Sequence, residues 1–270
     1  MSEQDETIIE LVDVVKQFDG RVVIDHLNLS IRRGETMVIM GGSGCGKSTT
    51  LKMMIGDTVP DEGQVRMFGQ DIWAIDDEEM DRLRRRFGIL FQSGALFNSM
   101  TVGENIALPL REHARLDENV IGIMIKIKLE LVGLRDFENL MPSQLSGGMK
   151  KRVGLARAVA LDPEILFYDE PTAGLDPIAT SVTDTLIRDL SQKLGVTSVV
   201  VTHDMASAFR IADRMAMLYR GELIALGTPE EIRRTSDPRV KQFVEGLADG
   251  PIPLRQSRTD YAADLLSGSS

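Results

Sequence analysis

The sequence contains very little cysteine: Cys45 is the only one among 270 residues. A single cysteine excludes any disulfide within the chain, and a chain of this length can bury a core that is stable without one. Scarce cysteine is typical of proteins from a reducing compartment, so the composition predicts a cytoplasmic location. Small secreted domains that depend on disulfides are excluded.

Long hydrophobic runs are also missing, because no apolar stretch approaches the roughly 18 to 20 residues that a helix needs to cross a bilayer. Residues 1–6 are acidic, whereas a signal peptide begins with basic residues. The longest apolar stretch, 119–134, is interrupted by Lys126, Lys128 and Glu130, which indicates an amphipathic helix packed on the core. Any role at a membrane is therefore expected to depend on a partner.

Positively charged residues are fewer than negatively charged ones. The chain has 31 Lys and Arg against 41 Asp and Glu, and its formal net charge is -10. Binding to a nucleic-acid backbone needs clustered Lys and Arg that neutralise phosphates. The sequence therefore argues against nucleic acid as a partner.

Hydrophobic patterning predicts an α/β fold. Period-two alternation and turn residues predict strands over 9–14, 22–31, 37–40 and 63–68, with turns at Asp19-Gly20 and Arg33-Gly34 and a helix over 47–55. Two continuous apolar runs, 165–168 and 198–202, are typical of strands buried on both faces of a parallel sheet. Helical segments lie between them, as right-handed βαβ crossovers require.

A mostly helical region separates these strands. Predicted helices cover 104–108, 117–132 and 146–160. We interpret about 93–160 as a helical subdomain inserted in the α/β core. A strand pair over 214–219 and 222–226, turning at Arg220-Gly221, and a helix over 229–234 follow. From about Gly250 the chain carries Pro, Ser and Gly and is predicted to have no core of its own.

Residues 41–48, directly after the predicted strand 37–40, match the pattern G-x-x-x-x-G-K-[ST] of a phosphate-binding loop. Glycines let successive N–H groups point inward, and the N-terminus of the following helix adds positive potential. Lys47 is predicted to reach the β and γ phosphates, and Ser48 to ligate Mg²⁺. The predicted nucleotide contacts are Gly41, Gly42, Ser43, Gly44, Cys45, Gly46, Lys47, Ser48 and Thr49. Cys45 is either a redox switch or a loop filler, and the second is favoured.

Two acidic residues, Asp169 and Glu170, end the buried strand 165–168. Ligands bind at strand ends in open α/β sheets, and a carboxylate there can hold Mg²⁺ opposite the phosphate loop. Asp169 is predicted to serve the metal through water. Glu170, one residue on, projects differently and is predicted to polarise an attacking water. The alternative is that the two acids only cap the following turn.

The segment Leu145-Ser146-Gly147-Gly148-Met149 lies between the two halves of the phosphate site and begins a predicted helix. It resembles the signature of ABC transporter ATP-binding subunits. The resemblance covers about residues 7–235 and implies a P-loop ABC ATPase, with a RecA-like parallel-sheet core, an antiparallel β subdomain and the helical insertion. In the family, the signature caps the γ-phosphate bound by the partner subunit. Ser146, Gly147 and Gly148 are therefore expected to contact ATP held by a second copy of the chain.

Four further residues lie where this family has functional ones. Gln92 matches the Q-loop glutamine that contacts Mg²⁺ and the water, and His203 matches the switch histidine at the γ-phosphate. Asp176 matches the D-loop that crosses the dimer interface. Phe18 lies where an aromatic residue stacks on adenine, although Tyr is commoner there. The resemblance thus implies Lys47, Gln92, Glu170 and His203 as catalytic residues, and Ser48, Gln92 and Asp169 as ligands of Mg²⁺.

A narrower resemblance rests on residues 91–97, 107–113, 237–243 and 250–253, and on Met149 in place of the signature glutamine. Together they are similar to the ATPases of the Mla phospholipid transport systems of Gram-negative bacteria. This implies a peripheral subunit at the cytoplasmic face of the inner membrane, with phospholipid as the indirect substrate. The implied partners are an inner-membrane permease subunit, an MCE-domain lipid-binding protein and a STAS-domain subunit.

The predicted boundaries are an ABC ATPase domain over 7–245 and a C-terminal extension over 246–270. The resemblance suggests that the extension contacts the neighbouring ATPase or the STAS partner. It also implies that residues 94–113 belong to the groove that receives the permease's coupling helix. Leu96 and Phe97 are therefore predicted to line that groove, and the core of the helical subdomain is the alternative.

Three other classes share part of these motifs: the ATPase of another ABC transporter, a soluble ABC ATPase without a permease, and another P-loop protein such as a GTPase or kinase. Repair-type ABC ATPases carry a long coiled-coil insertion and translation-type ones fuse two cassettes, and the sequence shows neither. A GTPase or kinase would leave residues 146–148 and His203 unexplained, and no Asn-Lys-x-Asp guanine reader is present.

Overall fold

The strands form two sheets that share one core. The computed structural model describes residues 6–253. Within that range the larger sheet has the order β10-β9-β3-β8-β7-β6 and the smaller the order β2-β1-β4-β5. The strands of the larger sheet are β3 (Thr36–Met40), β6 (Phe87–Leu90), β7 (Ile165–Asp169), β8 (Thr197–Thr202), β9 (Arg214–Tyr219) and β10 (Glu222–Gly227). Those of the smaller sheet are β1 (Thr7–Phe18), β2 (Arg21–Arg32), β4 (Glu62–Met67) and β5 (Gln70–Asp71).

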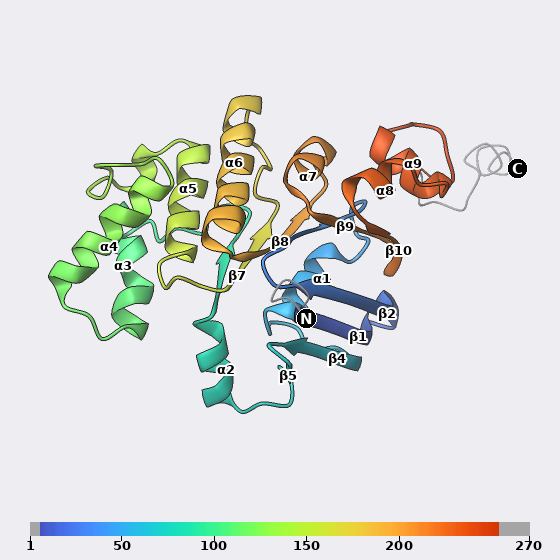
Figure 1. Cartoon of the computed structure of the whole chain (residues 1–270), viewed down its shortest axis with the longest axis horizontal. Helices are drawn as coiled ribbons and strands as arrows, with labels where there is room; N and C mark the ends of the chain where they lie inside the picture. Colours follow the sequence, from blue (N-terminus) through green and yellow to red (C-terminus); the bar gives the residue numbers. More distant parts are fainter. Residues whose placement is uncertain (1–5, 254–270) are drawn as a thin grey trace, which may run out of the picture.

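The helices cover both faces of the larger sheet (Figure 1). They are α1 (Lys47–Met54), α2 (Asp77–Arg84), α3 (Val102–His113), α4 (Glu118–Leu131), α5 (Gly147–Ala158), α6 (Pro177–Leu194), α7 (Met205–Ile211), α8 (Pro229–Arg233) and α9 (Pro238–Glu245). Helices α5, α6 and α7 lie on one side of the sheet, and α1 lies on the other with the antiparallel sheet. The predicted fold class, an α/β core with an antiparallel β subdomain and an inserted helical region, is confirmed.

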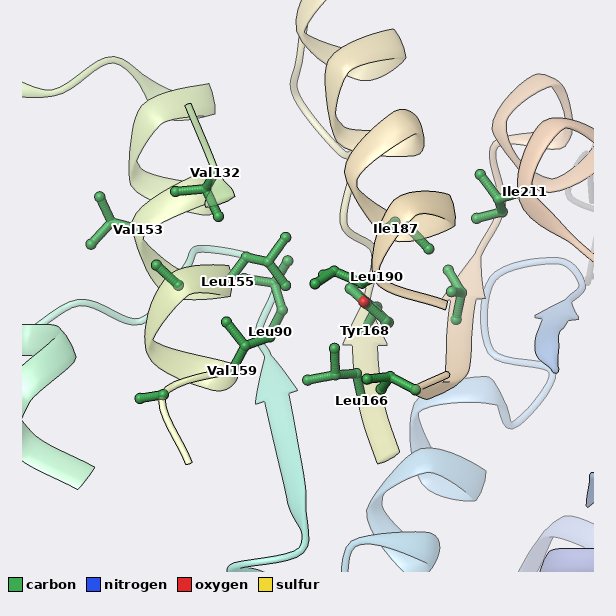
Figure 2. Close-up of a cluster of buried hydrophobic side chains, with 14 of the residues drawn as sticks. Leu90, Val132, Val153, Leu155, Val159, Leu166, Tyr168, Ile187, Leu190 and Ile211 are labelled. Carbon is green, nitrogen blue, oxygen red and sulfur yellow. The ribbon is translucent and has the colours of Figure 1, made fainter. Parts of the chain in front are cut away.

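The core has two halves because alternate residues of each central strand point to opposite faces. Leu166 and Tyr168 of β7 join the cluster beneath the helices, whereas Ile165 and Phe167 join the cluster beneath the antiparallel sheet. Figure 2 shows side chains from α5, such as Leu155, and from α6, such as Leu190, meeting those of β7. Burial on both faces explains why residues 165–168 of β7 and 199–201 of β8 are continuous apolar runs in the sequence.

Helix α4 corrects one prediction, because its apolar residues do not all face the core. Ile121 and Leu129 are buried, but Ile123 and Ile127 are 59% and 58% exposed. Lys128, one of the charged residues that interrupt the apolar stretch, is buried and pairs with Asp162. The helix therefore has an apolar strip that faces outward. No helix within residues 6–253 is long and apolar enough to cross a membrane.

Helices α2, α7 and α9 were not predicted. Each begins with an aspartate cap, in which Asp76, Asp204 and Asp237 accept from the N–H groups of Glu79, Ser207 and Arg239. They are only 8, 7 and 8 residues long and have few buried positions, so the apolar periodicity that reveals longer helices is weak. The aspartate caps were the available signal.

The first part of the C-terminal extension folds back on α9, which ends at Gly246 in the left-handed conformation. Gln242 is buried; its Oε1 accepts from the Ile252 N–H at 2.7 Å, and its Nε2 donates to the Ile252 and Leu247 carbonyls at 3.1 and 3.3 Å. Ile252 packs against the core. Residues 247–252 are therefore fixed to the domain, while residues 254–270 of the predicted extension lie outside the described residues.

Replacing Gln242 with methionine should release this segment. Gln242→Met keeps the side-chain length but leaves the Ile252 N–H without its acceptor, and an unsatisfied buried polar group costs about 1 to 3 kcal/mol. We expect hydrogen–deuterium exchange of residues 247–253 to accelerate about ten-fold or more. The exposed neighbour provides the control, Lys241→Met, which should exchange like the unmodified protein. Equal exchange rates in the two variants would contradict the role given to Gln242.

Candidate nucleotide site

Four of the predicted site segments meet at one edge of the larger sheet. The phosphate loop follows β3, Gln92 follows β6, Asp169 ends β7 and His203 follows β8. These strands are parallel, and their ends are level, since Met40 pairs with Thr202 and Leu90 with Tyr168. Carboxyl ends of parallel strands therefore present the four segments together, where ligands of open α/β sheets bind.

The phosphate loop has a backbone that only glycine allows at two positions. Gly41 and Gly46 have φ of 151° and 109°. A Cβ atom on Gly46 would lie 2.4 Å from Cδ1 of Ile24, and one on Gly41 would lie 2.3 Å from the Leu218 carbonyl oxygen. The loop is thus curled and closely packed before α1 begins at Lys47, which is the cradle that phosphate requires.

Lys47 and Cys45 are held inside this loop. Lys47 is buried, and its Nζ donates to the carbonyl oxygens of Gly41 and Gly42 at 2.8 and 3.1 Å. Burial also raises the pKa of the Cys45 thiol, although Lys47 opposes this. A buried thiol with a raised pKa is a poor nucleophile, which supports the interpretation of Cys45 as a filler of the loop.

Asp169 fits the chemistry of a magnesium ligand. Burial raises the pKa of its carboxyl group, Glu170 raises it further, and Lys52 and Lys47 act in the opposite direction. A bound cation would stabilise this carboxylate. Within residues 6–253 no group of three or more His, Cys, Asp and Glu could hold a metal. Magnesium at nucleotide phosphates is usually held by one or two carboxylates together with the phosphates, so the single carboxylate of Asp169, with the neutral oxygens of the predicted donors Ser48 and Gln92, fits it.

The structure brings Glu170 and His203 together, which their predicted roles did not specify. Nδ1 of His203 lies 2.8 Å from Oε1 of Glu170. Oε2 of Glu170 accepts from the Thr202 hydroxyl at 3.2 Å and from the His203 N–H at 3.3 Å. Glu170 itself has a left-handed backbone, with φ of 48°. Thr202 is thus a site residue that the sequence did not reveal, because its contact with Glu170 arises only where β7 and β8 pair.

The signature segment begins α5 and borders a cavity of its own. The Ser146 hydroxyl caps the helix by accepting from the Met149 N–H at 3.2 Å. A cavity of about 470 Å³ lies between the N-terminal parts of α5 and α6, lined by Ser146, Gly147, Gly148 and Asp176 among others. Asp176 caps α6 by accepting from the N–H groups of Ile178 and Ala179. Residues 41–49 do not line this cavity, so the signature and the phosphate loop are separate sites within one chain.

Phe18 and Gln92 are exposed at the positions expected for nucleotide contacts. Phe18 ends β1, is 47% exposed, and has Nζ of Lys16 at 5.2 Å from its ring centroid. Gln92 is exposed in the turn after β6. Neither side chain is committed to the core, so both are available to a ligand.

A separate groove of about 730 Å³ lies between α2, β6, α3 and the end of α5. Phe97 lines it together with Phe91, Ala95 and Pro109. Leu96 does not line the groove, since it packs against the core instead. Leu96 is half-buried and Phe97 is exposed, so Phe97 is the more accessible of the two.

Comparisons with known proteins agree with this geometry. A family model described as ABC transporter matches residues 24–173. The intermembrane phospholipid transport system ATP-binding protein MlaF of Escherichia coli is 44% identical over 262 residues, which is 97% of this chain and 97% of that protein. The probable ribonucleotide transport ATP-binding protein mkl of Mycobacterium leprae is 42% identical over 253 residues, which is 93% of this chain and 73% of that protein.

Solved structures show the same architecture. A dimeric, post-hydrolysis state of the ATP-binding cassette MJ0796 bound to ADP and Pi has a TM-score of 0.76 and 33% identity to this chain. The match covers 82% of this chain and 99% of that one. The phosphate loop, the acidic strand end, the signature helix and these relatives lead to one conclusion: the chain belongs to the ABC transporter family and is an ATP-hydrolysing cassette.

Proposed function

We propose that this ATPase drives a transporter that moves phospholipids between the inner and outer membranes and so maintains outer-membrane lipid asymmetry. The observation that carries the proposal is the near full-length match, 44% identity over 97% of both chains, to an intermembrane phospholipid transport ATPase. That match includes the C-terminal region, which the family model for residues 24–173 does not reach.

Ribonucleotide transport is the second candidate, because a probable ribonucleotide transport ATPase is almost equally identical, at 42%. This chain covers only 73% of that relative, against 97% of the phospholipid one. The difference in shared length favours phospholipid. Other ABC transporters and soluble ABC ATPases remain the broader alternatives.

The site residues suggest how hydrolysis proceeds. Lys47 would leave the loop carbonyls for the β and γ phosphates, and Phe18 would stack on the adenine. The Glu170 carboxylate would accept a proton from the attacking water, while His203, already at hydrogen-bond distance from Glu170, would contact the γ-phosphate. Ser48, Gln92 and Asp169 would hold Mg²⁺, which would neutralise charge on the phosphates.

Two copies of the chain are needed for a complete site in this proposal. The signature cavity contains no residue of the phosphate loop, so the N–H groups at the start of α5 have no phosphate from their own subunit. The solved relative is a dimer. A head-to-tail dimer would place the signature of one copy, with Asp176 beside it, against the nucleotide of the other.

The groove between α2 and α3 is the proposed contact with the membrane permease. Its lining is mainly apolar and includes the exposed ring of Phe97, with the Arg157 guanidinium 5.6 Å from the ring centroid. Such a groove fits an amphipathic helix of a partner. The chain would then be peripheral, at the cytoplasmic face of the inner membrane, in a complex with STAS-domain and MCE-domain subunits.

Replacing the proposed general base should stop hydrolysis but not binding. In Glu170→Gln the side chain keeps its shape but cannot accept the proton, so we expect turnover to fall about a hundred-fold or more. ATP should still bind, and size-exclusion chromatography with ATP and Mg²⁺ should show a stable dimer. Wild-type turnover in this variant would refute the role proposed for Glu170.

The transported substrate can be tested with the same variant. A tagged Glu170→Gln form, purified in mild detergent, should carry with it a permease, an MCE protein, a STAS protein and phospholipid, identified by mass spectrometry. A different permease would exclude the phospholipid proposal and keep the ABC assignment. Recovery without any membrane protein would favour a soluble ABC ATPase.

If the groove binds the permease, a substitution in it should impair assembly of the complex without impairing ATP hydrolysis. Phe97→Asp places a charge in an apolar interface, which is costly to bury. We expect the permease to be lost from the purified complex, while ATP hydrolysis by the isolated chain stays within about two-fold, as for most surface substitutions. Val59→Asp, at an exposed apolar residue outside the groove, is the control. Assembly of the Phe97→Asp protein at the control level would contradict the proposal.

A further inference from the structure

Lys151 is a buried cation of the signature helix α5, and its side chain contacts the loop after β7. It lies in the second turn of α5 and is 6% exposed. Its Nζ donates to the carbonyl oxygens of Glu170, Pro171 and Ala173 at 3.2, 2.9 and 2.7 Å. An ammonium group has three N–H donors, and one loop uses all of them. The loop that carries Glu170 therefore wraps around a side chain of the signature helix.

This arrangement opposes the preference of a charged group for water. Burial lowers the pKa of Lys151, and only the nearby Glu170 charge acts in the opposite direction. Three carbonyl dipoles replace part of the lost hydration, and each is held at ordinary hydrogen-bond distance from the ammonium. Lys151 therefore adds directional contacts that hold the loop, beyond apolar packing.

The conformation of Glu170 depends on this support. Its φ of 48° is a region that residues with a Cβ atom adopt rarely. The Glu170 N–H donates to the Val201 carbonyl at 2.9 Å, and the Glu170 carbonyl accepts from Lys151. The two bonds hold both peptide groups of the turn, and the turn directs the carboxylate toward Thr202 and His203.

Helix α5 is also in backbone contact with the turn that carries Gln92. A Cβ atom on Gly154 would lie 2.9 Å from the Gly94 carbonyl oxygen, and one on Gly94 would lie 2.9 Å from the Lys150 carbonyl oxygen. Arg157 donates to the Gly94 carbonyl at 3.1 Å. The helix therefore joins three places: the signature end, the Glu170 turn and the Gln92 turn beside the groove.

We propose that Lys151 is a positioning residue for ATP hydrolysis, because it fixes the turn that directs Glu170 and links that turn to the signature helix. The inference rests on the proposed role of Glu170. Lys151 follows Ser146 by five residues on a continuous helix, or about 7.5 Å along its axis. Contact of the signature end with the partner's nucleotide would thus be transmitted directly to the general base of the other site.

The first test separates turnover from binding in the full-length chain. Lys151→Met removes the donors and the charge at similar length, so the Glu170 turn is free to relax. We expect kcat to fall about ten-fold to a hundred-fold, as for a small misplacement of a reacting group, with KM and ATP affinity within about two-fold. Lys150→Met, the same change one residue earlier, should keep wild-type kcat. Wild-type kcat in Lys151→Met would overturn the inference.

The second test asks whether Lys151 acts through Glu170. In single-turnover assays, Lys151→Met combined with Glu170→Gln should be no slower than Glu170→Gln alone, within about two-fold, because the positioned group is already absent. If the rate losses of the two single variants multiplied in the double variant, Lys151 would have a general structural role, and the inference would be overturned. If Lys151→Met fails to bind ATP, Lys151→Gln, which keeps two donors and lacks the charge, replaces it in both assays.

The two proposals fail in different ways. Wild-type turnover in Glu170→Gln would refute the role of Glu170, and this inference with it. Two other outcomes would overturn only the role of Lys151. In both, turnover is slow in Glu170→Gln; in the first Lys151→Met has wild-type kcat, and in the second the rate losses of the two variants multiply in the double variant.

Discussion

The parallel pairing of β3, β8, β7 and β6 is the constraint on which the rest of the structure depends. Parallel strands all run in one direction, so the loops at their carboxyl ends must meet at one edge. Segments that are far apart in the chain, the phosphate loop, the Gln92 turn, Asp169 and His203, are adjacent for this reason. Burial of the strands on both faces keeps that edge rigid, because neither face can shift without disturbing packed side chains.

Buried lysines show how the protein uses positive charge in an acidic chain. Lys128 is paired with the carboxylate of Asp162 and belongs to the helical region. Lys47 and Lys151 contact backbone carbonyls instead. A carbonyl compensates an ammonium less than a carboxylate does, so Lys47 can exchange its loop contacts for phosphate oxygens. The carbonyl contacts of Lys151 are expected to persist instead, because all three acceptors belong to one loop that surrounds the ammonium group.

Close backbone packing explains how distant surfaces can be linked in the proposed transporter. Glycines at positions 94 and 154 let α5 touch the Gln92 turn, and Gly88 lets α5 approach β6. Larger side chains would separate these backbones and permit independent movement. The groove proposed for the permease and the signature proposed for the partner's nucleotide are therefore at two ends of one tightly packed helix.

The sequence by itself determined the elements whose residues are local and ordered along the chain: the phosphate loop with its strand and helix, the acidic strand end and the signature. Their patterns depend on glycine geometry and on apolar runs, which need no knowledge of distant contacts. It missed α2, α7 and α9, and it misjudged which faces of α4 are covered, because partial burial depends on which neighbours cover each face. Tertiary structure alone decided the contacts of Glu170 with Thr202 and His203 and of Lys151 with the loop at 170–173. These groups meet only when parallel strands and packed helices bring together residues that no local pattern relates.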